Sequence, residues 1–127
     1  PSMTRVSLQA AMQMLANGGV HKGQQLLSRG TIDLMRQNHL NEAQLEDFHN
    51  LYLAGYGYGL GVRVLMDKAA GQHNGHLGAF GWTGSMGTWA EADPERKLSV
   101  GYGHNMVPND EEYVHLRGRA AVYGCLA

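Results

Sequence analysis

The residues best suited to chemistry lie in one stretch, 76–89, which contains both tryptophans and four of the eighteen glycines. Within it, Thr83, Gly84 and Ser85 offer hydroxyl groups and backbone N–H groups that no bulky side chain covers. Groups of this kind hold a carboxylate or stabilise the oxyanion of an acyl-transfer reaction. The stretch is therefore the candidate for a binding or catalytic site.

The same residues also suit a purely structural role. Phe80 and Trp82 alternate, so they would share one face of an extended strand. Glycine weakens a strand and often marks a backbone that approaches another group closely. On composition alone, a glycine-rich edge strand with a tryptophan in the core is the simpler interpretation.

A nucleophile–base pair is not apparent in the sequence. Residues 83–87 depart from the Gly-x-Ser-x-Gly elbow, because Thr83 replaces the first glycine and a strand rather than a helix is predicted to follow. None of the five serines is followed three residues later by a lysine. Four acidic residues of the C-terminal third are more simply turn and helix-cap residues: Asp93, Glu95, Glu111 and Glu112.

Seven histidines raise the question of a metal site. His73 and His76 are three residues apart in a loop, and no cysteine or neighbouring carboxylate completes a ligand set. A metal-dependent protein that uses these two residues is the weakest of our hypotheses, and we expect no metal and no other cofactor. The remaining histidines are predicted to lie on the surface: His21, His39, His49, His104 and His115.

Length and composition set outer limits on the protein. With 127 residues, 43% hydrophobic and 17% charged, the chain predicts one globular domain at most. A net charge of −1 argues against a general affinity for nucleic acid or anionic membranes, and no apolar run reaches the roughly 20 residues of a membrane span. The single cysteine excludes an internal disulfide. No signal peptide is visible, so the compartment stays open with the cytoplasm favoured, and the start at Pro1 suggests a processed or excised piece.

Two helices are predicted to precede the candidate site, within a helical part that covers 1–54. Apolar residues at helical spacing predict the first from Ser2, its N-cap, to Leu15, with Gly18 and Gly19 ending it. After a loop over 20–27, Ser28 is expected to cap the second. Residues 41–53 are only weakly helical, and we predict a loop with at most one turn of helix.

The part from 55 to 107 is predicted to form antiparallel strands. Alternation over 56–66 predicts one strand, 78–84 a second, and 88–92 the start of a third. Residues 93–97 carry a strong turn signal, after which 98–102 alternate again. The C-terminal helix, within 108–127, should pack on the sheet through a stripe of Tyr113, Leu116, Ala120 and Tyr123. The fold class is α+β, with a sheet of about three strands covered by two N-terminal helices and one C-terminal helix.

Taken together in order and spacing, these motifs resemble those of the serine β-lactamase and penicillin-binding-protein family, in its class C-like and esterase branch. The motifs are the helix that ends in Gly18-Gly19, the Leu26-Leu27-Ser28 segment, the Gly-Tyr-Gly-Tyr-Gly-Leu-Gly run of 55–61, the Phe-Gly-Trp-Thr-Gly-Ser run of 80–85 and Asp93-Pro94-Glu95. The resemblance covers essentially all 127 residues, but it matches only the C-terminal portion of the family's chain. It implies part of the β-lactamase/transpeptidase-like fold.

The resemblance also implies roles for the candidate site. Trp82, Thr83 and Gly84 look like the family's Lys-Thr-Gly strand and would bind substrate, although Trp82 lacks the charge with which a lysine holds a substrate carboxylate. The backbone N–H of Ser85 would be one oxyanion-hole donor, a contribution of about 3–4 kcal/mol to transition-state stabilisation. The substrate would be a small acyl compound: an ester, an amide or a β-lactam.

Two motifs of the family are absent: Ser-x-x-Lys and Tyr-x-Asn, which lie upstream of the matched region. The leading hypothesis is therefore the C-terminal part of a serine hydrolase that acts through an acyl-enzyme, with the chain alone inactive. The missing N-terminal strands would leave a sheet edge open. The alternative is a non-catalytic binding or assembly module that recruits an N-terminal segment or a second copy at this edge. Neither hypothesis involves nucleic acid or a membrane.

Overall fold

The computed structural model describes residues 5–51 and 53–126 and shows an α+β fold, as the sequence predicts. Ser2, the predicted N-cap of the first helix, lies outside the described residues. The elements in chain order are α1 (Arg5–Ala16), β1 (Val20–His21), β2 (Gln24–Gln25), α2 (Arg29–Met35), α3 (Glu42–Leu51), β3 (Tyr56–Tyr58), β4 (Arg63–Leu65), β5 (Phe80–Thr83), β6 (Trp89–Asp93), β7 (Leu98–Tyr102) and α4 (Glu111–Gly124).

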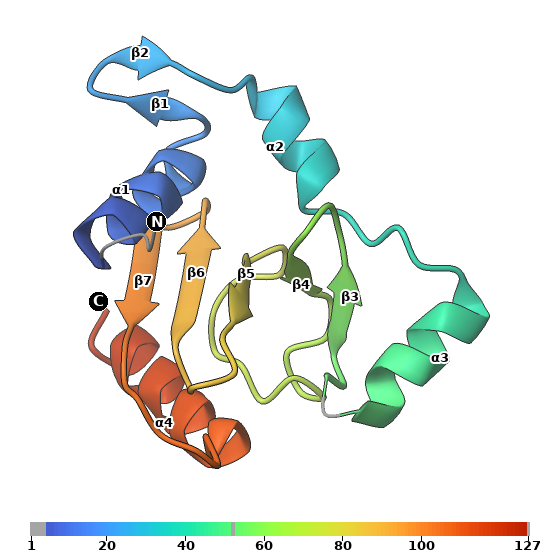
Figure 1. Cartoon of the computed structure of the whole chain (residues 1–127). Helices are drawn as coiled ribbons and strands as arrows, with labels where there is room; N and C mark the ends of the chain where they lie inside the picture. Colours follow the sequence, from blue (N-terminus) through green and yellow to red (C-terminus); the bar gives the residue numbers. More distant parts are fainter. Residues whose placement is uncertain (1–4, 52, 127) are drawn as a thin grey trace.

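The main sheet has five antiparallel strands in the order β3-β4-β5-β6-β7 (Figure 1). The prediction of about three strands is wrong, partly because β3 and β4 form a hairpin where one strand was expected over 56–66. Gly59 lies at the bend, where an added Cβ would collide with the carbonyl oxygen of Met35. Gly61 follows with φ +78°, a conformation that glycine adopts without strain. The predicted loop over 20–27 contains a second, two-stranded sheet formed by β1 and β2.

The two faces of the sheet carry different side chains. Alternate residues of a strand point to opposite faces, and Ala92 packs in an apolar cluster with Met12 and Ala16 of α1. We call this side the α1 face. Glu91 points the other way and contacts α4, so we call that side the α4 face. Helix α1 therefore covers one side of β6 and β7, and α4 covers the other.

Helix α3 is a ten-residue helix where the sequence predicted mainly loop. Its start is fixed by a reciprocal pair of hydrogen bonds. The Gln44 N–H donates to Asn41 Oδ1 at 2.9 Å, and the Asn41 N–H donates to Gln44 Oε1 at 3.0 Å. This is the capping-box arrangement, which satisfies two of the backbone donors that a helix start leaves free. The prediction failed because it weighed apolar spacing, which is weak in this segment, and overlooked the Asn-x-x-Gln signal.

Helix α4 packs on the sheet through a mainly polar stripe. Of the predicted stripe only Tyr123 is buried, Leu116 is half-buried, and Tyr113 and Ala120 are exposed; the other buried residues are His115 and Arg119. The physical reason lies in the sheet, because its α4 face presents the carboxylate of Glu91, which needs hydrogen-bond donors when buried. The prediction that His115 lies on the surface is wrong for the same reason.

In the described residues, no helix combines the length and apolar character needed to cross a bilayer.

The prediction that Ser28 caps the second helix is confirmed, because Ser28 Oγ accepts the N–H of Thr31 at 3.1 Å.

Candidate active site

Strand β5 is the middle strand of the five, so the interpretation of 76–89 as an edge strand is wrong. It pairs with β4 on one side and with β6 on the other. Gly81 permits this close pairing, because a Cβ at this position would collide with the carbonyl oxygen of Ala90. The N–H of Gly84 donates to the Thr88 carbonyl at 2.9 Å, and this bond closes the turn between β5 and β6.

Trp82 forms one wall of a groove on the α1 face. Its side chain is 44% exposed, and its ring meets that of Tyr58 edge to face, with centroids 5.5 Å apart. The groove has a volume of about 290 Å³ and runs between α1 and β5. Leu8 and Met12 of α1 form its opposite wall, and Gly84 lies at the end nearest the turn. The other tryptophan, Trp89, is buried on the α4 face.

Ser85 lies on the β5–β6 turn, where it is exposed. Its carbonyl accepts a hydrogen bond from Asn109 Nδ2 at 3.1 Å, and the neighbouring Met86 carbonyl accepts the Met106 N–H at 3.2 Å. Within the described residues no acceptor binds the Ser85 N–H. The segment before α4 thus holds the turn from one side and leaves a backbone donor free at the end of β5.

Thr83 borders the groove, but its hydroxyl group is used on the α4 face. Side chains alternate along β5, so Thr83 points away from the face that carries Trp82. Its hydroxyl interacts with Glu111, whose carboxylate also receives Arg63 Nη1 at 3.3 Å. Burial acts to raise the pKa of Glu111, but the neighbouring His115 and Thr83 side chains and the charge of Arg63 outweigh it and hold this pKa below its ordinary value. The lining of the groove therefore includes Trp82 and Gly84, Ser85 lies on the adjoining turn, and the Thr83 side chain points away from the Trp82 face.

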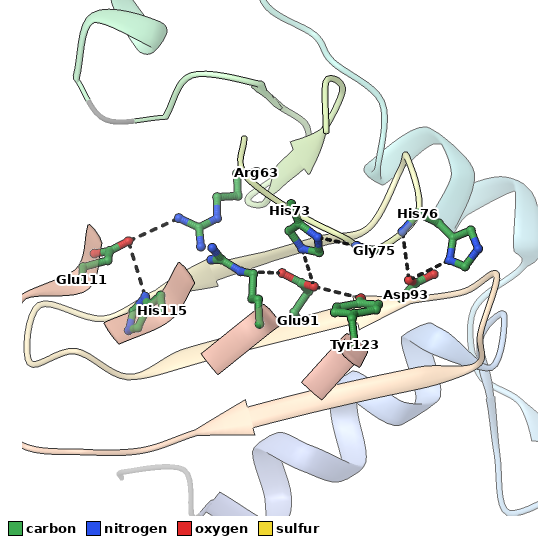
Figure 2. Close-up of polar contacts among 10 residues, drawn as sticks. Arg63, His73, Gly75, His76, Glu91, Asp93, Glu111, His115 and Tyr123 are labelled. Atoms are coloured by element: carbon green, nitrogen blue, oxygen red, sulfur yellow. Dashed lines mark hydrogen bonds and ion pairs between the residues drawn. The ribbon is translucent and has the colours of Figure 1, made fainter. Parts of the chain in front are cut away.

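A buried polar network fills the space between the sheet and α4 (Figure 2). Glu91 is its centre: Oε1 receives His73 Nε2 at 2.9 Å and the Tyr123 hydroxyl at 3.1 Å, and Oε2 receives Arg119 Nε at 3.2 Å. The Gly75 N–H donates to His73 Nδ1 at 2.8 Å, so the ring proton facing Glu91 is on Nε2. This network was not predicted from the sequence, although two signals are present. Glu91 stands between two alanines, and its partners on α4, Arg119 and Tyr123, are four residues apart.

His115 and Glu111 belong to a second polar cluster on the α4 face, which contacts the β5–β6 turn. His115 Nε2 donates to the Gly87 carbonyl oxygen at 2.7 Å, and its Nδ1 lies 3.8 Å from the Glu111 carboxylate. Gly87 belongs to the β5–β6 turn and has φ +88°. The turn is therefore held from α4 as well as from the segment before it, an arrangement that fixes the direction of the free N–H.

The two histidines of the metal hypothesis, His73 and His76, each contact a different carboxylate. His73 bonds to Glu91, and His76 Nδ1 lies 3.1 Å from Asp93 Oδ2. Among residues 5–51 and 53–126, no group of three or more potential ligands is arranged to hold a metal ion. In the same residues, no hydrogen bond joins the Ser85 hydroxyl to a base. The arrangement combines an uncharged groove with a backbone N–H on the adjoining turn that has no acceptor among the described residues.

We expect the protein to lose stability in acid because of the carboxylates on the α4 face. Burial would raise the pKa of Glu91, but His73, Arg119 and Tyr123 together hold this pKa below the ordinary value of 4.5. A carboxyl group with a lowered pKa in the folded state stabilises the fold above its unfolded pKa, and the contribution is lost as pH falls toward the folded value. Urea unfolding at a series of pH values between 6 and 3 should therefore show a constant free energy of unfolding above about pH 5 and a decline below it. A free energy that stays constant down to pH 3 would contradict the assignment.

The fold of the chain is similar to that of known hydrolases and related proteins. Its described elements match solved structures of the β-lactamase/transpeptidase fold. EstCE1, a hydrolase with promiscuous acyltransferase activity, shares 28% identity with the chain at a TM-score of 0.67, over 89% of this chain and 28% of its own. A penicillin-binding-protein homologue from Caulobacter crescentus shares 26% identity at a TM-score of 0.61, over 78% of this chain and 25% of its own.

Simvastatin synthase (LovD) from Aspergillus terreus, at 17% identity and a TM-score of 0.63, shows likeness in fold alone, over 90% of this chain and 31% of its own.

Two curated relatives are the protein Rv1367c and an uncharacterized protein from another strain, both from Mycobacterium tuberculosis. Each is 34% identical over 98 residues, or 72% of this chain. The chain spans only 24% of the length of these relatives. No protein-family model matches it.

Proposed function

We propose that the chain supplies one wall of the active site of a serine hydrolase that works through an acyl-enzyme. The observation that carries this proposal is the free N–H of Ser85 on the β5–β6 turn, directly after Gly84, which lines an apolar groove. The likeness to EstCE1, itself a hydrolase, supports it. The nucleophile and its base would come from a polypeptide segment outside these 127 residues, and the substrate would be an ester, an amide or a β-lactam.

The proposal assigns a role to each residue at the groove. The Ser85 N–H donates to the oxygen of the substrate carbonyl as negative charge develops on it. Trp82 and Gly84 position the acyl group. Thr83 contributes through its main chain, because its hydroxyl is bonded to Glu111.

We expect the 127-residue chain alone not to hydrolyse p-nitrophenyl butyrate, because its described residues provide no activated nucleophile. A hybrid in which the chain replaces the matched portion of EstCE1 should hydrolyse this ester, since the remainder of EstCE1 then supplies the missing groups. Release of p-nitrophenol measures both reactions, and circular dichroism verifies that the hybrid is folded. A folded hybrid without activity would contradict the proposal. So would saturable hydrolysis by the chain alone that Ser85→Ala abolishes.

A second candidate function, a binding or assembly module, rests on the edge strand β7. The other edge, β3, is covered at Tyr58, whose carbonyl accepts the His39 N–H at 2.9 Å. Strand β7 runs from Leu98 to Tyr102 without a charged residue or a proline, the features that usually protect an edge, although the Gln9 amide of α1 donates to the Ser99 carbonyl at 3.2 Å. We propose strand addition there, by an upstream segment or by a second copy of the chain. Size-exclusion chromatography with light scattering tests self-association, and a monomer at every concentration would rule it out.

A further inference from the structure

The chemical character of the groove indicates which acyl groups it takes. None of the described residues that line the groove carries a charge. They include Leu8, Met12, Val62, Trp82, Thr88 and Ala90. Trp82 keeps 44% of its surface exposed, which is unusual for the largest apolar side chain unless a partner covers it. An apolar ligand would gain free energy here by removing this surface from water.

The nearest buried cations are on the wrong side of the sheet to serve the groove. Arg63 is bonded to Glu111 on the α4 face, and Arg119 is bonded to Glu91 there. Both arginines are almost fully buried between the sheet and α4. A ligand carboxylate in the groove would therefore lose water without gaining a charged partner, and this loss is costly.

The size of the groove limits the ligand as well. A volume of about 290 Å³ is at the lower end of the range of about 300–1,000 Å³ for small-molecule sites. The Trp82 ring cannot move freely to enlarge it, because Tyr58 packs edge-on against it. A short aliphatic chain or a single ring is of the size that this space holds.

We infer that the groove between α1 and β5 binds a short, uncharged acyl group and discriminates against acyl groups that carry a carboxylate. Describing the ligand as an acyl group rests on the proposed function. The preference for a neutral, apolar ligand rests on the groove itself, so binding can be tested without turnover.

The two tryptophans allow this test on the chain in solution. Both tryptophans line the groove, but the Trp89 ring packs against His115 and Arg119 on the α4 face and is 3% exposed, so the Trp89 indole N–H is an internal control. In ¹H–¹⁵N spectra, hexanamide should cause a saturable shift of the Trp82 indole signal and leave that of Trp89 in place. Adipamate, which has the same chain length but ends in a carboxylate, should bind at least about tenfold more weakly, a difference of 1.4 kcal/mol. Equal affinity for the two compounds, or no shift at Trp82, would overturn the inference.

A charge placed in the groove should reverse the preference. Trp82→Lys should bind adipamate more tightly than hexanamide, as followed at the backbone amide of Gly84, because the new ammonium pairs with the carboxylate. Leu60→Lys is the matched control: Leu60 is also exposed but does not line the groove, so this variant should keep the preference for hexanamide. A Trp82→Lys variant that melts like the parent chain and still prefers hexanamide would contradict the inference. An inactive EstCE1 hybrid together with selective binding of hexanamide would refute the proposed function alone.

Discussion

Replacing Ser85 by proline in the EstCE1 hybrid is expected to lower kcat by about 10²–10³-fold, the usual effect of deleting one oxyanion-hole donor. Proline has no backbone N–H, so the substitution removes the donor itself. The Ser85 N–H has no acceptor among the described residues, so no internal hydrogen bond is lost. Gly84 precedes Ser85 and tolerates the restriction that proline imposes on its neighbour.

Ser85→Ala is the matched control for this experiment. Alanine keeps the N–H and removes only the hydroxyl, so kcat should stay within a few-fold of the parent hybrid. Equal loss of activity in the two variants would show that the hydroxyl matters and the N–H does not. Steady-state kinetics with p-nitrophenyl butyrate, combined with melting curves for both variants, distinguishes a lost donor from a disturbed turn.

Glu91→Ala should destabilise the chain by about 3–5 kcal/mol, the effect of breaking a buried ion pair by removing one partner. Glu91 is 4% exposed and is bonded to His73, Arg119 and Tyr123. Its loss would leave the Arg119 guanidinium buried without the carboxylate that balances its charge. Such a change is a large part of the 5–15 kcal/mol by which domains are normally stable.

Glu95→Ala provides the control, since Glu95 is exposed in the β6–β7 turn four residues away and should have little effect. Urea unfolding measures both variants. If Glu91→Ala proves too unstable to purify, Glu91→Gln keeps the shape of the side chain and should show a smaller loss of the same sign. A Glu91→Ala variant as stable as Glu95→Ala would contradict the role given to the network.

Much of the fold can be predicted from the sequence where a local signal is strong. Helical spacing and Ser28 predict α1 and α2, and the Asp-Pro-Glu turn predicts the β6–β7 hairpin. The failures occur where tertiary contacts decide the structure. Alternation over 56–66 fits one strand, and only the approach of the Met35 carbonyl to Gly59 shows that the chain bends there. Helix α4 buries its polar stripe because Glu91, distant in sequence, lies beneath it.

The candidate site stays a prediction, and its orientation could not be read from the sequence. The cluster of glycines, tryptophans and hydroxyls lies on β5 and the turn after it, where the N–H of Ser85 has no acceptor among the described residues. The side of β5 on which each side chain lies depends on which helix covers which face. Because α4 covers one face of β5 and α1 lies on the other, the Thr83 hydroxyl interacts with Glu111 and the Trp82 side chain lines the groove. Periodicity in β5 predicts that Trp82 and Thr83 point apart, but it cannot tell which of them meets the substrate.

A crystal structure of the EstCE1 hybrid inactivated by a phosphonate ester would test the central claim most directly, because the phosphonyl oxygen takes the place of the oxyanion. We expect this oxygen at about 2.7–3.1 Å from the Ser85 nitrogen, with the alkyl group of the phosphonate beside Trp82. An oxygen held by other donors, with the Ser85 N–H facing solvent, would contradict the account.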